Sequence, residues 1–195
     1  MPRPQPAPMT AEEFVEWHYH QTERYELVNG YPVRMMTGAR QGHNVAAANI
    51  IMSLGPQTRK RGCRTTGSDT AVRTRDGLGT RYPDVVVDCG PRDPDAFIGS
   101  EPTLVVEVHS KSTSMIDTTD KLEEYQAHPT IRTIVLVEPG RVDVKVYERE
   151  ESGWSVARYH DLDATIALDS VGAHLPMRDI YMDLDPKPVP ALDTI

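Results

Sequence analysis

Two unbroken apolar runs rich in β-branched residues constrain this chain more than any other feature. Val85-Val86-Val87 and Leu104-Val105-Val106 contain no polar residue, unlike a strand that leaves one face in water. Runs of this kind suit strands that are buried on both faces of a sheet. Helical patterns precede and follow them, after Gly42 and at residues 117–128. We therefore expect an α/β fold in which a mixed β-sheet is flanked by helices.

Turn and cap residues predict the elements before these runs. Residues 10–13 form a capping box that starts a short helix. Residues 24–28 indicate a strand that enters the Asn29-Gly30 turn, with a return strand at residues 31–36. The next helix is expected to stop at Gly55-Pro56, because proline lacks the N–H that a helix needs.

Length limits the chain to one domain. The 195 residues can bury one sizeable core but are too few for two comfortable domains. We expect a disordered Pro-rich tail at residues 1–9, one domain at residues 10–185 and a second Pro-rich tail at residues 186–195. No apolar run approaches the length of a membrane span, and the first residues lack the apolar stretch of a signal peptide. These features predict a cytoplasmic protein with no membrane partner.

The two cysteines suggest no special chemistry. Cys63 and Cys89 fit neither a metal-ligand spacing nor a disulfide framework. Cys89 ends an apolar run. We therefore expect a buried, inert thiol there.

The charge distribution argues against a protein that coats nucleic acid without specificity. The net charge is −8, whereas neutralising phosphates requires clustered cations. One third of the chain is an exception, and it begins with a group of predicted nucleic-acid contacts. These are Arg59, Lys60, Arg61 and Arg64. The alternative interpretation is a solvated helix end with exposed strand faces.

Each apolar run carries one carboxylate at its edge. Asp84 directly precedes the first run, and Glu107 directly follows the second. A carboxylate at the edge of a core costs free energy unless it is paired or bound to a metal. Two such acids on neighbouring strands repel each other until a cation joins them. Oxygen ligands suit Mg²⁺ or Mn²⁺, and we expect the main-chain carbonyl of Val108 as a third ligand. Such an ion supports phosphodiester hydrolysis.

The order of these motifs resembles a known group of nucleases. Pro83-Asp84 followed by Glu107-Val108-His109 is similar to the PD-(D/E)xK motif with its lysine replaced. Further segments resemble the Uma2 branch of that superfamily, across residues 20–182. They are Tyr25–Gly30, Gly42-His43, Arg81–Val85 with a tyrosine inserted, Val105–Val108, Ser110–Thr113, Asp117, Lys121 with Tyr125, and Val137–Pro139. The resemblance implies a restriction-endonuclease-like core and Mg²⁺-dependent endonuclease activity on nucleic acid, with DNA preferred by analogy. Cutting two strands further suggests a homodimer.

Two departures from the family pattern concern the strand end after Glu107. Lys111 replaces the usual proline, and His109 occupies the position where the superfamily carries its lysine. Strand alternation places His109 on the face of Glu107, so its ring either approaches the site or is hydrogen-bonded at the strand end. We expect Lys121 to supply the missing cation from the following helix, beside Tyr125. The alternative is an exposed lysine that pairs with Asp117 or Glu124.

Two further residues are candidates through the resemblance. Glu26 is predicted to act beside the metal as a fourth catalytic residue, and the alternative is a carboxylate paired with Arg24 or Arg34. His43 opens a helix and is a candidate accessory residue. Two other functions stay open: a non-catalytic binding or regulatory module with a nuclease fold, and a hydrolase of a small phosphoester. The acidic net charge of −8 favours these alternatives, and the carboxylate pair favours the nuclease.

Overall fold

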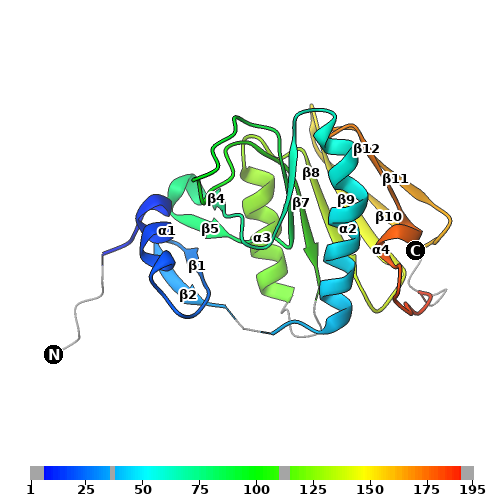
Figure 1. Ribbon diagram of the computed structural model, residues 1–195, viewed down its shortest axis with the longest axis horizontal. Helices are drawn as coiled ribbons and strands as arrows, with labels where there is room; N and C mark the ends of the chain where they lie inside the picture. The colour runs from blue at the N-terminus through cyan, green and yellow to red at the C-terminus, as the bar shows by residue number, and fades with distance from the viewer. Residues whose placement is uncertain (1–6, 36–37, 110–114, 190–195) are drawn as a thin grey trace.

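The main sheet has six strands in the order β10-β9-β8-β7-β6-β3, of which β7 to β10 are labelled in Figure 1. The computed structural model describes residues 7–35, 38–109 and 115–189, without the side chains of residues 115–118. Neighbours β7 and β8 are parallel, and the other neighbours are antiparallel, so the sheet is mixed as expected. The strands are β3 (Arg64–Gly67), β6 (Val85–Asp88), β7 (Pro102–Val108), β8 (Thr133–Glu138), β9 (Asp143–Glu150) and β10 (Gly153–Tyr159).

Two smaller sheets and the helices complete the described fold. A four-stranded sheet has the order β2-β1-β5-β4, and β11 pairs with β12. These strands are β1 (Tyr25–Val28), β2 (Tyr31–Arg34), β4 (Val72–Thr74), β5 (Gly79–Arg81), β11 (Thr165–Leu168) and β12 (Ala173–Pro176). The helices are α1 (Ala11–Tyr19), α2 (Gln41–Arg59), α3 (Met115–Ala127), α4 (Met177–Ile180) and the short 3-10 turn η1 (Arg75–Gly77). No helix within the described ranges is both long and apolar enough to cross a membrane.

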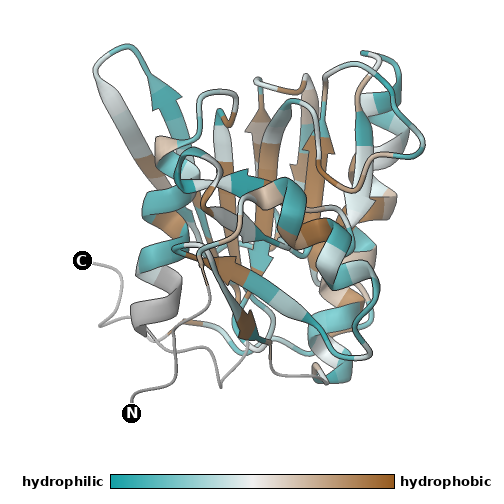
Figure 2. Cartoon of the chain, turned by 90° about the vertical axis from the view of Figure 1, so that its left-hand side faces the viewer, coloured by the Kyte–Doolittle hydropathy of each residue, from teal (hydrophilic) through white to brown (hydrophobic). Residues whose placement is uncertain are grey.

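Both faces of the central strands are buried, as the unbroken apolar runs predict. Val85 and Val87 share a core with Ile50 of α2, whereas Val86 shares a core with Tyr125 of α3. Each of these side chains is fully buried. Figure 2 shows the most hydrophobic colours on the central strands. Burying one such valine stabilises the fold by about 1.5–3 kcal/mol. Residues of even and odd number on β6 and β7 therefore face different helices.

Helix α2 continues past the predicted stop at Gly55-Pro56, so that prediction is wrong. The helix ends at Arg59. Leu54 and Thr58 lie on its buried side, on either side of the proline. Proline cannot donate to the carbonyl of Met52, but that residue is 63% exposed and water can reach it. The packing of the last turn therefore outweighs the missing hydrogen bond.

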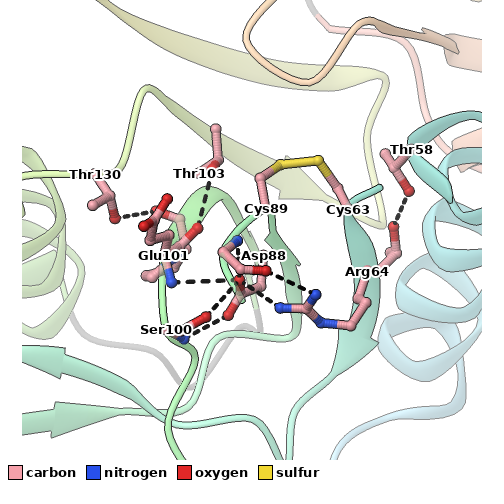
Figure 3. Close-up of a disulfide and its surroundings, with 12 residues drawn as sticks. Thr58, Cys63, Arg64, Asp88, Cys89, Ser100, Glu101, Thr103 and Thr130 are labelled. Carbon is pink, nitrogen blue, oxygen red and sulfur yellow. Dashed lines mark hydrogen bonds and ion pairs between the residues drawn. A yellow bond between two sulfur atoms is a disulfide. The ribbon is translucent and has the colours of Figure 1, made fainter. Parts of the chain in front are cut away.

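The two cysteines form a disulfide, which corrects the prediction of an inert thiol (Figure 3). Strands β3 and β6 are antiparallel and place Arg64 opposite Asp88. The next pair outward is Cys63 and Cys89, whose Cα atoms are 4.1 Å apart. The bond therefore links two strand ends that lie side by side. Their separation of 26 residues contains no hint of this pairing, because the register between the strands creates it.

Both predicted tails contact the domain where the structure describes them. The N–H of Met9 donates to the carbonyl of Gly30 at 2.8 Å. Gly30 has φ +82°, and a Cβ there would lie 2.4 Å from the Cβ of Pro8, so the Asn-Gly turn requires glycine. At the other end, the N–H of Val142 donates to the carbonyl of Lys187 at 3.0 Å. Residues 1–6 and 190–195 lie outside the described residues.

Candidate active site

A cleft with a cavity volume of about 910 Å³ lies between the four-stranded sheet, the start of α2, the end of β7 and helix α3. Every residue predicted for catalysis, metal binding or an accessory role lines it. These are Glu26, His43, Asp84, Glu107, Val108, His109, Lys121 and Tyr125. Segments that lie up to 99 residues apart in sequence, from Glu26 to Tyr125, therefore meet in one place.

The register of β6 and β7 brings the two predicted carboxylates together. Val85 is paired with Val106, so one further step outward places Asp84 opposite Glu107. The Cβ atoms of such opposed residues lie about 4.5–5.5 Å apart. The N–H of Val108 donates to Oδ2 of Asp84 at 2.7 Å. Like charges directly opposite each other are destabilising, so this pair favours a bound cation.

The Glu107 carboxylate lies on the face of β7 that is covered by α3. The Tyr125 hydroxyl donates to its Oε1 at 2.7 Å. Nζ of Lys121 lies 3.8 Å from the same oxygen. Burial and the nearby Asp84 raise the pKa of Glu107 to about 7, although Lys121 acts in the opposite direction. Negative charge at this carboxylate is therefore only partly compensated by the protein.

Lys121 lies at the site, as predicted, and Glu26 lies beside it. Nζ of Lys121 is 3.1 Å from Oε1 of Glu26, and the lysine side chain is only 14% exposed. Oε2 of Glu26 accepts a hydrogen bond from Arg81 at 2.8 Å. The alternative pairing of Glu26 with Arg24 or Arg34 is wrong, because those arginines pair with Asp69 and Glu23.

The sequence analysis missed Glu124 of α3 as a residue that supports the site. It accepts hydrogen bonds from Arg81 at 2.7 and 2.8 Å, from Arg75 at 2.7 Å and from Thr74 at 2.8 Å. Burial alone would raise the pKa of Glu124, but these donors lower it below its ordinary value. Arg81 thus joins Glu26 to Glu124. The three-residue spacing from Lys121 was the available signal, because it places Glu124 on the same helix face.

A family model described as "Uma2: Putative restriction endonuclease" matches residues 11–178. The chain belongs to the Uma2 family. It is 29% identical over 179 residues to "Uncharacterized protein slr1290" of Synechocystis sp., an alignment that covers 90% of this chain and 93% of that protein.

A solved structure shares the fold of this Uma2 chain. It is titled as a crystal structure of "a putative nuclease belonging to DUF820" from Anabaena variabilis. The two chains superpose with a TM-score of 0.70 at 19% sequence identity, over 89% of this chain and 98% of the other. The mixed sheet flanked by helices is therefore also the architecture of a structure whose title describes "a putative nuclease".

Two histidines of this Uma2 chain border the carboxylates in different ways. Nε2 of His43 lies 3.2 Å from Oδ2 of Asp84, and this hydrogen bond raises the pKa of His43 above its ordinary value. His109 follows the end of β7, and its main-chain N–H donates to the carbonyl of Val137 at 2.7 Å. Burial lowers the pKa of the His109 ring, so it is neutral near pH 7. His43 therefore touches the carboxylate pair directly.

The basic residues predicted to contact nucleic acid lie at the other end of α2. His43 and Arg59 are 16 residues apart on this helix, which corresponds to about 24 Å at 1.5 Å per residue. Arg59, Lys60, Arg61 and Arg64 do not line the cleft. Arg64 instead pairs with Asp88 at 2.9 Å. Contact of this group with nucleic acid stays a prediction, and it would require a substrate that spans the length of the helix.

The donor set at the carboxylates fits a hard divalent cation. Within the described residues, no three His, Cys, Asp or Glu side chains converge as a metal-binding group. Mg²⁺ nevertheless binds through one or two carboxylates and keeps several waters, so Asp84 and Glu107 with a main-chain carbonyl suffice. The opposed carboxylates and the incompletely compensated charge of Glu107 support this fit.

Proposed function

We propose that this Uma2 chain is a metal-dependent nuclease that hydrolyses phosphodiester bonds, with DNA as its substrate. One observation carries the proposal: Asp84 and Glu107 face each other from adjacent strands, and Nζ of Lys121 on α3 lies 3.8 Å from Glu107. This arrangement supplies two oxygen ligands and one cation within a single cleft. The family description, "Putative restriction endonuclease", is consistent with that chemistry.

Asp84, Glu107 and the main-chain carbonyl of Val108 would hold Mg²⁺ or Mn²⁺. When bound, such an ion polarises a phosphoryl oxygen and lowers the pKa of a bound water. The structure supports this assignment through the hydrogen bond from Val108 to Asp84, which holds the aspartate against the end of β7. It is further supported by the Tyr125 hydroxyl, which fixes one oxygen of Glu107.

Lys121 would stabilise the charge that develops on the phosphate. Phosphodiester cleavage concentrates negative charge on the phosphoryl oxygens, and a preorganised cation lowers the barrier most when it need not move. Lys121 lies near both Glu26 and Glu107, so its amine is already positioned in the cleft. Arg81 fixes Glu26 in turn through its hydrogen bond. Glu26 therefore acts by orienting the lysine.

A plasmid-nicking assay in Mg²⁺ or Mn²⁺ tests this function. The native chain should convert supercoiled DNA to nicked or linear forms. Asp84→Asn should reduce the rate by about 1000-fold, the scale of losing a major transition-state interaction. Asp95→Asn is a matched control, because it makes the same chemical change at an exposed loop position outside the cleft.

Three outcomes would contradict the proposal. Full activity in Asp84→Asn would exclude the assigned site. Binding of the plasmid without cleavage in either metal would identify a nucleic-acid-binding module. Hydrolysis of a small phosphodiester such as bis(p-nitrophenyl) phosphate, without attack on plasmid or single-stranded DNA, would identify a small-molecule hydrolase.

A further inference from the structure

A second cavity, of about 230 Å³, adjoins the catalytic cleft. Arg24 and Tyr82 line both spaces, so they form a shared wall. The other walls of the second cavity include His18, Tyr19, Asp69 and Phe97. Tyr82 precedes Asp84 by two residues, a separation that spans at most about 7 Å. The second cavity therefore shares a wall with the cleft that contains the carboxylate pair.

Two aromatic rings at this cavity are exposed to water. Tyr19 is 70% exposed and Phe97 is 49% exposed. Their ring centroids lie 5.4 Å apart, although one comes from α1 and the other from the loop between β6 and β7. Exposed aromatic rings grouped at a cavity mark a binding site more often than a structural need. Such rings are the usual platform on which unpaired nucleobases stack.

The inner wall of the second cavity presents polar groups in a fixed arrangement. The main-chain N–H of Tyr25 donates to Nε2 of His18, so the proton of a neutral ring lies on Nδ1. Nδ1 lies 2.9 Å from the Tyr82 hydroxyl oxygen and therefore donates to it. The Tyr82 O–H is thus left to donate to a ligand. Burial and the charge of Arg24 lower the pKa of His18, which keeps this ring neutral.

Arg24 is held at the boundary between the two spaces. Its guanidinium donates to the carbonyl of Ser68 and lies 3.2 Å from a carboxylate oxygen of Asp69. Its Cζ lies 5.8 Å from the centre of the Tyr82 ring. A cation fixed at this point can contact a phosphate in the cleft or the edge of a base in the second cavity. Asp69 adds an acceptor for the N–H groups of a base.

We propose that the second cavity binds one unpaired nucleobase of the strand whose phosphate lies at Asp84 and Glu107. The base stacks on Phe97, the ring of Tyr19 borders the stacked base at an angle of 53° to Phe97, and the polar edge of the base meets Tyr82, Arg24 and Asp69. This inference rests on the proposed nuclease function and names its substrate more closely as a strand with an unpaired nucleotide. A paired base cannot enter the cavity, because its faces and its hydrogen-bonding edge are occupied within the duplex.

The acidic character of the chain makes such a stacking site consequential. With a net charge of −8, the protein gains little general attraction to a phosphate backbone. Affinity must therefore come from local contacts, of which base stacking is the least dependent on salt.

Binding of a short fluorescein-labelled DNA single strand, followed by fluorescence anisotropy, tests this site. The measurement uses Ca²⁺, a hard cation that takes the same oxygen ligands. Phe97→Ala should weaken binding by about ten-fold, and Tyr19→Ala should also weaken it. Both residues are exposed, so the variants should fold. Met182→Ala is the control, since it removes an equally exposed apolar side chain outside the cavity and should bind as the native chain does.

An abasic nucleotide placed at successive positions of the strand identifies the stacked base. One position should weaken binding to the native chain by about ten-fold yet have little further effect on Phe97→Ala. Native-like affinity in both alanine variants would overturn the inference. An altered oligomeric state of these variants with unchanged DNA affinity would also overturn it and would assign the rings to contact with a second copy.

The nicking assay separates this inference from the proposed function. If the native chain cuts plasmid DNA while Phe97→Ala and Tyr19→Ala bind single strands normally, the base-binding site alone is wrong. If the native chain neither cuts plasmid DNA nor binds single strands, the proposed function fails and the base-binding site fails with it.

Discussion

Two aspartates, Asp84 and Asp88, lie at opposite ends of β6, and their surroundings differ. Asp88 is the last residue of β6, and its carboxylate accepts hydrogen bonds from Arg64 at 2.9 Å, Gly90 at 2.8 Å, and the N–H of Ser100 at 2.7 Å (Figure 3). Asp84 precedes β6, accepts from Val108 and His43, and faces the carboxylate of Glu107. Saturation with donors marks a structural acid, whereas opposition to a second acid marks a place for a cation.

The main chain packs closely around the Asp88 carboxylate. A Cβ at Gly99 would lie 2.9 Å from Oδ2 of Asp88, so the loop before β7 passes too closely for a larger residue. The disulfide between Cys63 and Cys89 joins β3 to β6 at the same end of β6. At the Asp84 end the strands instead border a cavity of about 910 Å³. The Asp88 end of β6 is therefore held by a disulfide and hydrogen bonds, whereas the Asp84 end is accessible from the cleft.

A similar contrast separates two glutamates, Glu124 on α3 and Glu107 on β7. Glu124 is surrounded by Arg81, Arg75 and Thr74, and its pKa is lowered. The pKa of Glu107, which α3 covers, is raised to about 7 by burial and by Asp84. The pKa values of two glutamates within one network thus shift in opposite directions. The balance between donors and neighbouring acids decides which of them remains available to a metal.

After the loss of nicking activity expected for Asp84→Asn, the largest expected effect concerns Lys121, the cation beside Glu107. Lys121→Ala should lower the nicking rate by about 100-fold or more, because the developing phosphate charge loses a preorganised partner. Mn²⁺ affinity and the cooperative unfolding transition should change little. If this variant stays active while His109→Ala or Lys111→Ala is inactive, the catalytic cation comes from the strand end. Lys111 itself lies outside the described residues.

A smaller effect separates the two aspartates by stability. Asp88→Asn should lower the free energy of unfolding by about 2 kcal/mol, since it weakens several hydrogen bonds to a charged acceptor. Asp84→Asn should change it by less than about 0.5 kcal/mol, because losing the charge relieves repulsion with Glu107. Urea denaturation in EDTA measures both values. Equal losses in the two variants would mean that both aspartates are structural.

The smallest expected effect is the pH dependence associated with Glu124. Its pKa in the folded chain lies below the ordinary value of 4.5. Stability from this carboxylate is therefore fully present above about pH 4.5 and is lost as the pH falls through the folded-state pKa. The stability difference between the native chain and Glu124→Gln should narrow in that acidic range. A difference that stays constant from neutral pH downward would contradict the role of Arg81 as its partner.

The fold and much of the site could be predicted from local sequence. The unbroken apolar runs predict strands that are buried on both faces. Asp84 and Glu107 directly border these runs, so the runs also predict that both carboxylates lie at the ends of buried strand segments. The helical spacing of Lys121 and Tyr125 then predicts that both reach the same face, which the structure confirms. Each of these inferences depends on residues that are neighbours in sequence or within one element.

The failed predictions concern partners that are distant in sequence. The pairing of Cys63 with Cys89 depends on the register between β3 and β6. The pairing of Glu26 with Arg81 depends on how the small sheet meets the main one. Helix α2 passes through Pro56 because its last turn is packed against the core. Local sequence does not encode any of these arrangements by itself.

Calorimetric titration with Mn²⁺ tests the central claim most directly, because it requires no knowledge of the substrate. The native chain should bind at one or two weak sites, and binding should vanish in Glu107→Gln and in Asp84→Asn. Asp88→Asn should bind as the native chain does, since its carboxylate already serves Arg64 and the loop before β7. Full Mn²⁺ binding in Asp84→Asn or Glu107→Gln would contradict the assignment of the metal to the site between Asp84 and Glu107, where β6 and β7 border the cleft.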